Sequence, residues 1–126
     1  MSVEGEVVAE IGPGLLVLLA VARGDDPANA GRLAEKVRKL RVFDDGEGRM
    51  NEPLGERQVL CISQFTLYGD ASRGNRPSYT TAAPPEAAEP LYERFCEALD
   101  AERGLFGARM SVDLSNDGPV TLLLEA

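Results

Sequence analysis

The chain has 126 residues, of which 44% are apolar, so one domain with a real hydrophobic core is expected. Its net charge of −8 disfavours sequence-independent binding to duplex nucleic acid, because an acidic protein repels the phosphate backbone at long range. The chain has no histidine, which excludes Ser-His and Cys-His catalytic pairs. With Cys61 and Cys96 as the only cysteines, no metal and no cofactor is expected.

Composition and the N-terminal residues also bear on where the protein is found. No apolar run reaches the roughly 18 residues of a membrane span. The segment Met1–Glu6 has neither the basic nor the apolar region of a signal peptide. Both cysteines lie in apolar patterns and are expected to be buried thiols rather than a disulfide. These features predict a cytoplasmic protein.

The first half of the chain predicts strands on either side of one helix. Residues 3–10 alternate loosely and residues 15–22 are apolar throughout, as in a half-buried strand and a fully buried one. An Asp-Pro pair at 26–27 is typical of a helix start, and apolar residues at helical spacing predict a helix over 27–40. A short strand is expected to begin at 42–43.

The second half predicts another strand, another helix and two final strands. Residues 57–68 predict a strand with a buried apolar part, and a second amphipathic helix is expected between Pro85 and Gly104. Residues 110–114 alternate as a half-buried strand, and residues 120–124 predict the last one. This order predicts an α+β domain, with a mixed or antiparallel sheet forming a barrel-like core and two packed helices.

Residues 63–67, Ser-Gln-Phe-Thr-Leu, directly follow the apolar part of a predicted strand. Polar side chains at such a place either bond to neighbouring backbone or contact a ligand, because an unpartnered buried polar group costs about 1–3 kcal/mol. On a regular strand, Ser63 and Phe65 face one side while Gln64 and Thr66 face the other. The backbone N–H groups of Phe65 and Thr66 are alternative donors for an ester oxygen.

A second motif, residues 116–121, reads Asn-Asp-Gly-Pro-Val-Thr and predicts a turn. Its Gly118 lets the backbone approach a ligand closely. Pro119 leaves the neighbouring carbonyls free to accept hydrogen bonds, and a rigid pair of carbonyls suits an ammonium group. An ordinary surface turn is the alternative that these residues leave open.

Together, these two motifs resemble the motif pair of the D-aminoacyl-tRNA deacylases. Other stretches resemble the same family, in order along nearly the whole chain, so residues 1–126 are expected to form a single domain of this kind. These stretches are residues 3–6, 14–19, 41–43, 48–51, 76–79, 89–92 and 106–110.

The resemblance implies a cytoplasmic homodimer that hydrolyses the ester between a D-amino acid and the terminal adenosine of tRNA, releasing free D-amino acid and tRNA. It also implies removal of glycine mischarged onto alanine tRNA. In the family the Gly-Pro bond is cis, and the loop of one subunit reaches into the pocket of the other, where its carbonyls hold the amino group. The implied site residues are Ser63, Gln64, Phe65 and Thr66 on the catalytic wall, and Gly118, Pro119, Asn116 and Thr121 on the substrate-binding loop.

A chain without histidine can support this reaction. With adenosine, ester carbonyl and amine fixed, a D-side chain points outward, whereas an L-side chain would collide with the Gly118-Pro119 backbone. Glycine has no side chain and escapes this rejection. The neighbouring ribose 2′-hydroxyl can activate water while backbone donors stabilise the oxyanion. Thr66 is a nucleophile candidate by residue type, but it ranks lower because no base stands near it in the sequence.

Phosphate contacts need cations, and the basic residues cluster in two places. Arg73 and Arg76 lie in a long polar loop, a kind of segment that is often functional, and are the first choice for contacts to tRNA. Lys36, Arg38 and Lys39 are the second choice. Ordinary solvated charge is the alternative for both clusters.

The chain also departs from the family pattern. The family usually begins with an extra strand that contains a Gln-Arg-Val segment, and this chain starts after it. Two internal stretches, 51–59 and 100–105, are shorter. The absent first strand leaves open an inactive dimeric module that binds the tRNA end. A further alternative is a relative that deacylates L-alanyl-tRNA, which would need the Gly118-Pro119 bond to be trans.

Overall fold

A three-stranded parallel sheet forms the centre of the molecule in the computed structural model, which describes all 126 residues. Its strands are β3 (Gly14–Leu19), β6 (Gln58–Ser63) and β7 (Glu102–Arg103), in the order β3-β6-β7. Parallel neighbours need crossover connections, and the two helices supply them. Since two smaller sheets are antiparallel, the expected mixed sheet content is present, but the largest sheet is parallel.

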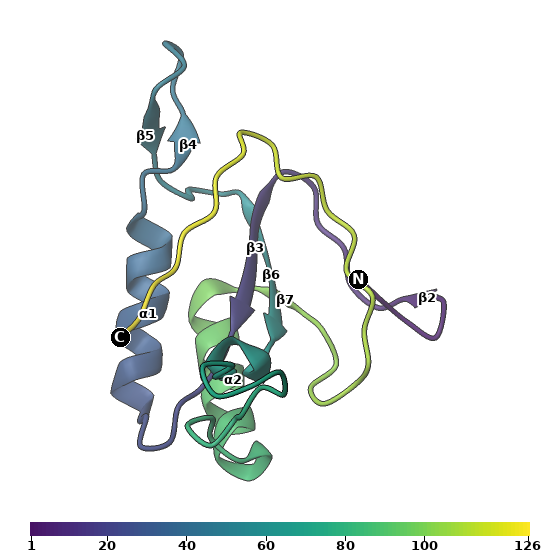
Figure 1. Cartoon of the computed structure of the whole chain (residues 1–126). Coiled ribbons are helices and arrows are strands. Elements are labelled where there is room, and N and C mark those ends of the chain that lie inside the picture. The colour runs from purple at the N-terminus through teal and green to yellow at the C-terminus, as the bar shows by residue number, and fades with distance from the viewer.

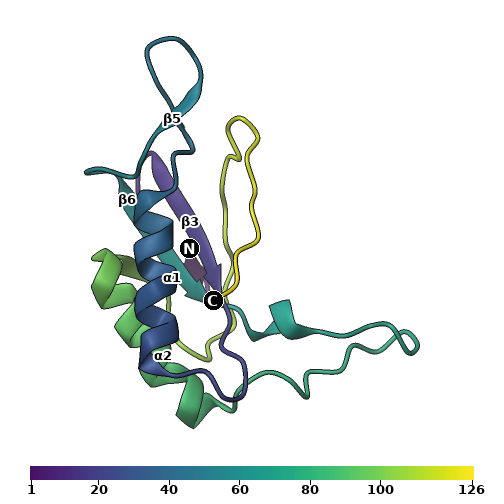
Figure 2. The ribbon, with the colours of Figure 1, turned by 90° about the vertical axis from the view of Figure 1, so that its left-hand side faces the viewer.

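Both predicted helices are present. Helix α1 covers Pro27–Lys39, and at its start Asn29 N–H donates to the Asp26 carboxylate while Asp26 N–H donates to the Asn29 side chain. This reciprocal cap satisfies two backbone donors that the first turn leaves free. Helix α2 covers Pro85–Leu99. The two helices contact each other and lie on one face of the sheet, with the last part of the chain on the other side (Figures 1 and 2).

The main hydrophobic core lies between the helices and the sheet. Cys61 and Cys96 are free thiols with no exposed surface, as the sequence predicts. The buried Tyr92 hydroxyl donates to the Cys61 carbonyl at 2.8 Å, which ties α2 to β6. The ten buried residues of this core are Leu19, Ala34, Val37, Leu54, Val59, Cys61, Tyr92, Phe95, Cys96 and Leu99.

The N-terminal residues form a hairpin instead of one continuous strand. Strands β1 (Ser2–Val3) and β2 (Glu6–Val7) pair antiparallel. The expected strand over residues 3–10 is wrong because Glu4 and Gly5 both adopt positive φ, 51° and 83°, and reverse the chain between them.

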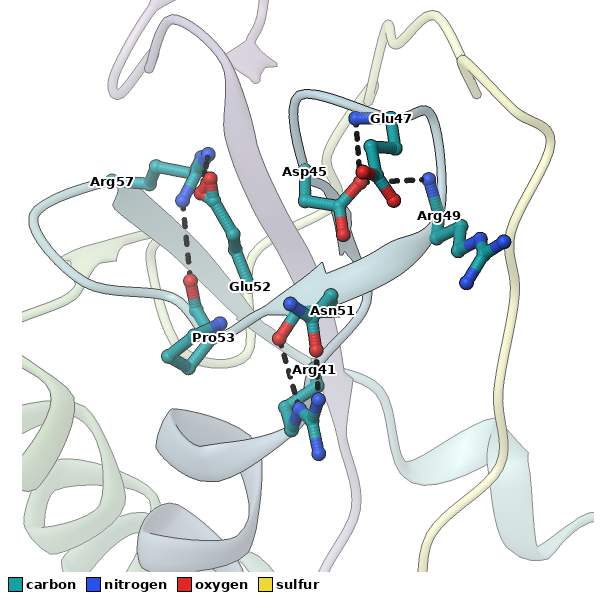
Figure 3. A network of polar contacts seen from close by, with 8 residues as sticks. All are labelled: Arg41, Asp45, Glu47, Arg49, Asn51, Glu52, Pro53 and Arg57. Atoms are coloured by element: carbon teal, nitrogen blue, oxygen red, sulfur yellow. Dashed lines mark hydrogen bonds and ion pairs between the residues drawn. The ribbon is translucent and has the colours of Figure 1, made fainter.

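A second hairpin projects away from the body of the molecule beyond α1 (Figures 1 and 2). It consists of β4 (Phe43–Asp44) and β5 (Met50–Glu52). The Asp45 carboxylate accepts hydrogen bonds from the N–H groups of Arg49 and Glu47, which closes the tip and lowers the pKa of Asp45 (Figure 3). At the base, Arg41 Nε donates to the Asn51 carbonyl at 2.9 Å.

The two strands predicted near the C-terminus are absent. Residues 110–114 and 120–124 have no strand assignment, and the one bridge in this region joins Ser111 to Ser2. An alternating pattern becomes a strand only where another edge is free to pair with it. The sheets stay separate and no barrel closes, so the barrel-like core remains unconfirmed. Leu114, Leu122 and Leu123 are 60%, 57% and 78% exposed. None of the helices is long and apolar enough to span a membrane.

Candidate functional site

The first motif lies where strand β6 ends. The expected strand over 57–68 is only half right, because β6 stops at Ser63 and a 3₁₀ helix, η1, covers Phe65–Tyr68. Gln64 N–H donates to the Leu19 carbonyl at 2.7 Å and makes the last contact with the neighbouring strand. The change of conformation overrides the alternation expected for a strand, so Ser63, Gln64, Phe65 and Thr66 form one compact corner.

The polar groups of this corner bond to one another. The Gln64 side-chain amide donates to the Thr66 hydroxyl. No carboxylate and no amine contacts that hydroxyl, so its one side-chain neighbour is a hydrogen-bond donor and not a base. A hydroxyl nucleophile needs an adjacent base to take its proton. Thr66 is exposed, and Phe65 beside it is 55% exposed.

A long loop follows η1 and lies against it. Phe65 meets Tyr79 of this loop edge to face, with ring centroids 5.0 Å apart and planes at 71°. Arg73 and Arg76 are exposed in the same loop, and neither takes part in an ion pair. The tyrosine of this loop was not among the expected site residues; its aromatic ring within a polar stretch was the available signal.

A small cavity of about 50 Å³ lies between η1 and the start of α1. Tyr68 lines it, and burial, with the Asp25 and Glu125 carboxylates, raises the pKa of Tyr68. The sequence did not single out Tyr68. No group of three or more histidine, cysteine, aspartate or glutamate side chains is arranged to hold a metal ion.

The second motif is an exposed turn held by its own side chains. Asn116 Nδ2 donates to the Thr121 hydroxyl at 2.8 Å, and Val120 N–H donates to the Asn116 side-chain oxygen at 3.2 Å. The peptide bond between Gly118 and Pro119 is cis. Asn116 and Thr121, which were predicted to bind the substrate, close the turn through their side chains.

The fold does not bring the two motifs together within one chain. Residues 63–68 lie at the end of the sheet where β3 and β6 finish, with the 69–84 loop beside them. The turn of the C-terminal segment lies toward the opposite end, near the start of β3 (Figures 1 and 2). No hydrogen bond joins the two motifs. Within a single chain the two motifs are therefore separate from each other.

Known proteins resemble this chain over its whole length. A family model described as D-Tyr-tRNA(Tyr) deacylase matches residues 1–125. Three relatives described as D-aminoacyl-tRNA deacylase are 56%, 52% and 49% identical to the chain, and come from Symbiobacterium thermophilum, Myxococcus xanthus and Chlorobaculum parvum. The matches cover all of this chain and 88%, 87% and 90% of those relatives.

Two solved structures resemble the fold. One, described as c-Myc DNA Unwinding Element Binding Protein, is 37% identical with a TM-score of 0.92, and the match covers 99% of this chain and 90% of that one. The other, described as a probable eukaryotic D-amino acid tRNA deacylase, has a TM-score of 0.64 at 15% identity, covering 86% and 83%, and shows the fold alone. By the family model and the relatives at about half identity, the chain belongs to the D-Tyr-tRNA(Tyr) deacylase family.

Proposed function

We propose that this protein hydrolyses the ester between a D-amino acid and the terminal adenosine of tRNA, releasing the free D-amino acid and the tRNA in the cytoplasm. Family membership over residues 1–125 is the observation that carries the proposal. The family acts on tRNA, and the two exposed motifs supply donors and acceptors suited to an aminoacyl ester. The net charge of −8 disfavours duplex DNA as an alternative partner.

The active unit is a homodimer in which each site takes one motif from each chain. This assignment is supported by the position of the two motifs toward opposite ends of the sheet (Figures 1 and 2). A two-fold dimer can place the end of one subunit that carries the turn against the end of the other that carries η1. The exposed leucines at 114, 122 and 123 supply apolar surface for such an interface.

Chirality is read by backbone and not by a side-chain pocket. The carbonyls of the Gly118-Pro119 loop of the partner subunit hold the substrate amine. With the ester carbonyl also fixed, an L-side chain collides with this loop, while a D-side chain points away from it. Glycine presents no side chain to collide, so glycine mischarged onto alanine tRNA is a second substrate.

The chemistry uses the RNA itself. The 2′-hydroxyl of the terminal ribose activates a water molecule, and the backbone N–H groups of Phe65 and Thr66 stabilise the oxyanion that forms on the ester carbonyl. Ser63 and Gln64 complete the wall. The contact from the Gln64 amide supports a structural role for the Thr66 hydroxyl, because a donor neighbour cannot take its proton.

The tRNA end needs few cations. Arg73 and Arg76 are exposed and free of ion pairs in the loop beside η1, which supports contacts to phosphates of the acceptor end. Lys36, Arg38 and Lys39 lie on α1; Lys39 is paired with Glu35 and Arg38 donates to the Ala98 carbonyl, which makes this cluster less available.

Ester loss from D-Tyr-tRNA and L-Tyr-tRNA, followed with labelled tyrosine, tests the proposal. We expect rapid loss from the D-form and at least about 100-fold slower loss from the L-form, because a clash removes productive binding. Equal rates on both forms contradict the chirality argument. Binding of the D-form without turnover identifies an inactive module that binds the tRNA end, and preferential loss from L-Ala-tRNA identifies the L-alanyl relative.

A further inference from the structure

Tyr79, in the loop after η1, packs against the corner formed by residues 63–66. Its ring packs against the Phe65 ring in a T-shaped pair with a centroid distance of 5.0 Å, and Phe65 forms no other aromatic contact. More than half of the Phe65 side chain is exposed, so few core residues hold it in place. The loop residue is therefore a principal support of the Phe65 ring.

The Tyr79 ring also stands against the 3₁₀ turn itself. Gly69 follows η1, and its N–H donates to the Thr66 carbonyl at 2.9 Å. A Cβ built on Gly69 would lie 3.0 Å from the Thr66 carbonyl oxygen and 3.0 Å from Tyr79 Cε1. A side chain at Gly69 would therefore crowd both the turn and the ring, so η1 and Tyr79 lie close together at this glycine.

The loop fixes Tyr79 from both sides. Just before it, Asp70 and Ser78 exchange two backbone hydrogen bonds, each 2.8 Å long. Just after it, Ala82 N–H donates to the Tyr79 carbonyl at 3.1 Å, and Arg23 Nε donates to the Thr80 carbonyl at 2.8 Å. The Tyr79 hydroxyl makes no hydrogen bond within the chain, so what the residue contributes here is its ring.

We infer that Tyr79 is a positioning residue for the ester hydrolysis: through Phe65 it holds η1 so that the Phe65 and Thr66 N–H groups face the developing oxyanion. This inference rests on the proposed function. Oxyanion donors act mainly in the transition state, and displacement of a reacting group by about 1 Å can cost roughly 100-fold in rate. Loss of the ring therefore lowers kcat and leaves KM nearly unchanged.

The test compares Tyr79→Ala with Tyr79→Phe, which keeps the ring and removes only the unbonded hydroxyl. With D-Tyr-tRNA we expect Tyr79→Ala to lower kcat by about 10- to 100-fold with KM within about twofold, and Tyr79→Phe to match the wild type. Thr80→Ala, an exposed side chain in the same loop, is the matched control and keeps wild-type kcat. Tyr79→Leu restores apolar volume without an aromatic ring, and its kcat is expected to be lowered as in Tyr79→Ala.

Hydrogen exchange gives a second reading that does not need activity. The amides of Leu67 and Gly69, which bond within and after η1, should exchange faster in Tyr79→Ala and Tyr79→Leu than in Tyr79→Phe. Wild-type kcat in both ring-deleted variants, or unchanged exchange in them, overturns the inference. If the wild-type enzyme itself fails to hydrolyse D-Tyr-tRNA, the proposed function is wrong, and the exchange rates alone decide whether Tyr79 positions the turn.

Discussion

A D-Tyr-tRNA whose terminal adenosine lacks the 2′-hydroxyl is expected to resist hydrolysis by this protein, while the Thr66→Ala variant keeps most of its activity on the normal substrate. Loss of the group that activates water costs about 10²- to 10⁴-fold in rate. Thr66→Ala should cost less than about tenfold, because its hydroxyl contacts the Gln64 amide and no base. Release of labelled tyrosine under single-turnover conditions measures both effects.

Two controls make this pair of results decisive. The deoxy substrate should still compete with normal D-Tyr-tRNA, which shows that it binds but does not react. Thr66→Ser keeps a hydroxyl at the same position and should behave as the wild type in every assay. Full hydrolysis of the deoxy substrate, combined with an inactive Thr66→Ala variant, would restore Thr66 as the nucleophile.

Gly118→Ala is expected to lower kcat/KM for D-Tyr-tRNA by about 100-fold while changing the melting temperature little. Gly118 has φ of +142°, and an added Cβ would lie 3.0 Å from both the N and the Cγ2 of Val120. The turn must shift to relieve a strain of about 1–3 kcal/mol. Because the turn is exposed and bonded only to itself, we expect the shift to displace the carbonyls without unfolding the domain.

Gly48→Ala is the matched control for this variant. Gly48 lies at the tip of the β4–β5 hairpin with φ of +75°, and an added Cβ there would meet nothing within 4 Å. The control should therefore share the conformational cost of a positive φ and keep full activity. An unfolded Gly118→Ala protein would instead assign the turn a structural role, and a fully active one would remove it from the site.

The helices could be predicted from the sequence because their signals are local. The Asp26 cap, the following proline and the apolar spacing together define α1, whose observed end at Lys39 is one residue from the expected one. The parallel pairing of the central sheet could also have been predicted, because a strand, a helix and another strand in succession favour parallel neighbours. The expectation of a mixed or antiparallel sheet did not take that order into account.

The corner at residues 63–66 could be singled out from the sequence, but its shape could not be predicted. Ser63 to Thr66 alternate in a way that suits a continuing strand, and only the tertiary contact from Gln64 N–H to Leu19 marks where pairing stops. The partner of Tyr79 could not be predicted for the same reason, although its aromatic ring within a polar stretch was a signal. Its contact with Phe65 spans a long loop, and no local pattern encodes a pairing at that separation.

The prediction of two strands near the C-terminus was wrong for a different reason. Residues 110–114 and 120–124 have the composition of strands, yet a strand also needs an edge with which to pair, and the sequence of one segment does not state whether that edge exists. In this fold the pairing is limited to the bridge between Ser111 and Ser2.

The separation of the two motifs has a genetic consequence. If each site joins the corner of one chain to the turn of the other, two chains of low activity can complement each other. A chain with Gly118→Ala and a chain with Tyr79→Ala, mixed in equal amounts and allowed to exchange, would form mixed dimers with one intact site and one doubly defective site. About half of the dimers would be mixed, and each mixed dimer would have one intact site of two. About one quarter of the wild-type activity is therefore expected from a mixture of two variants that are each nearly inactive alone.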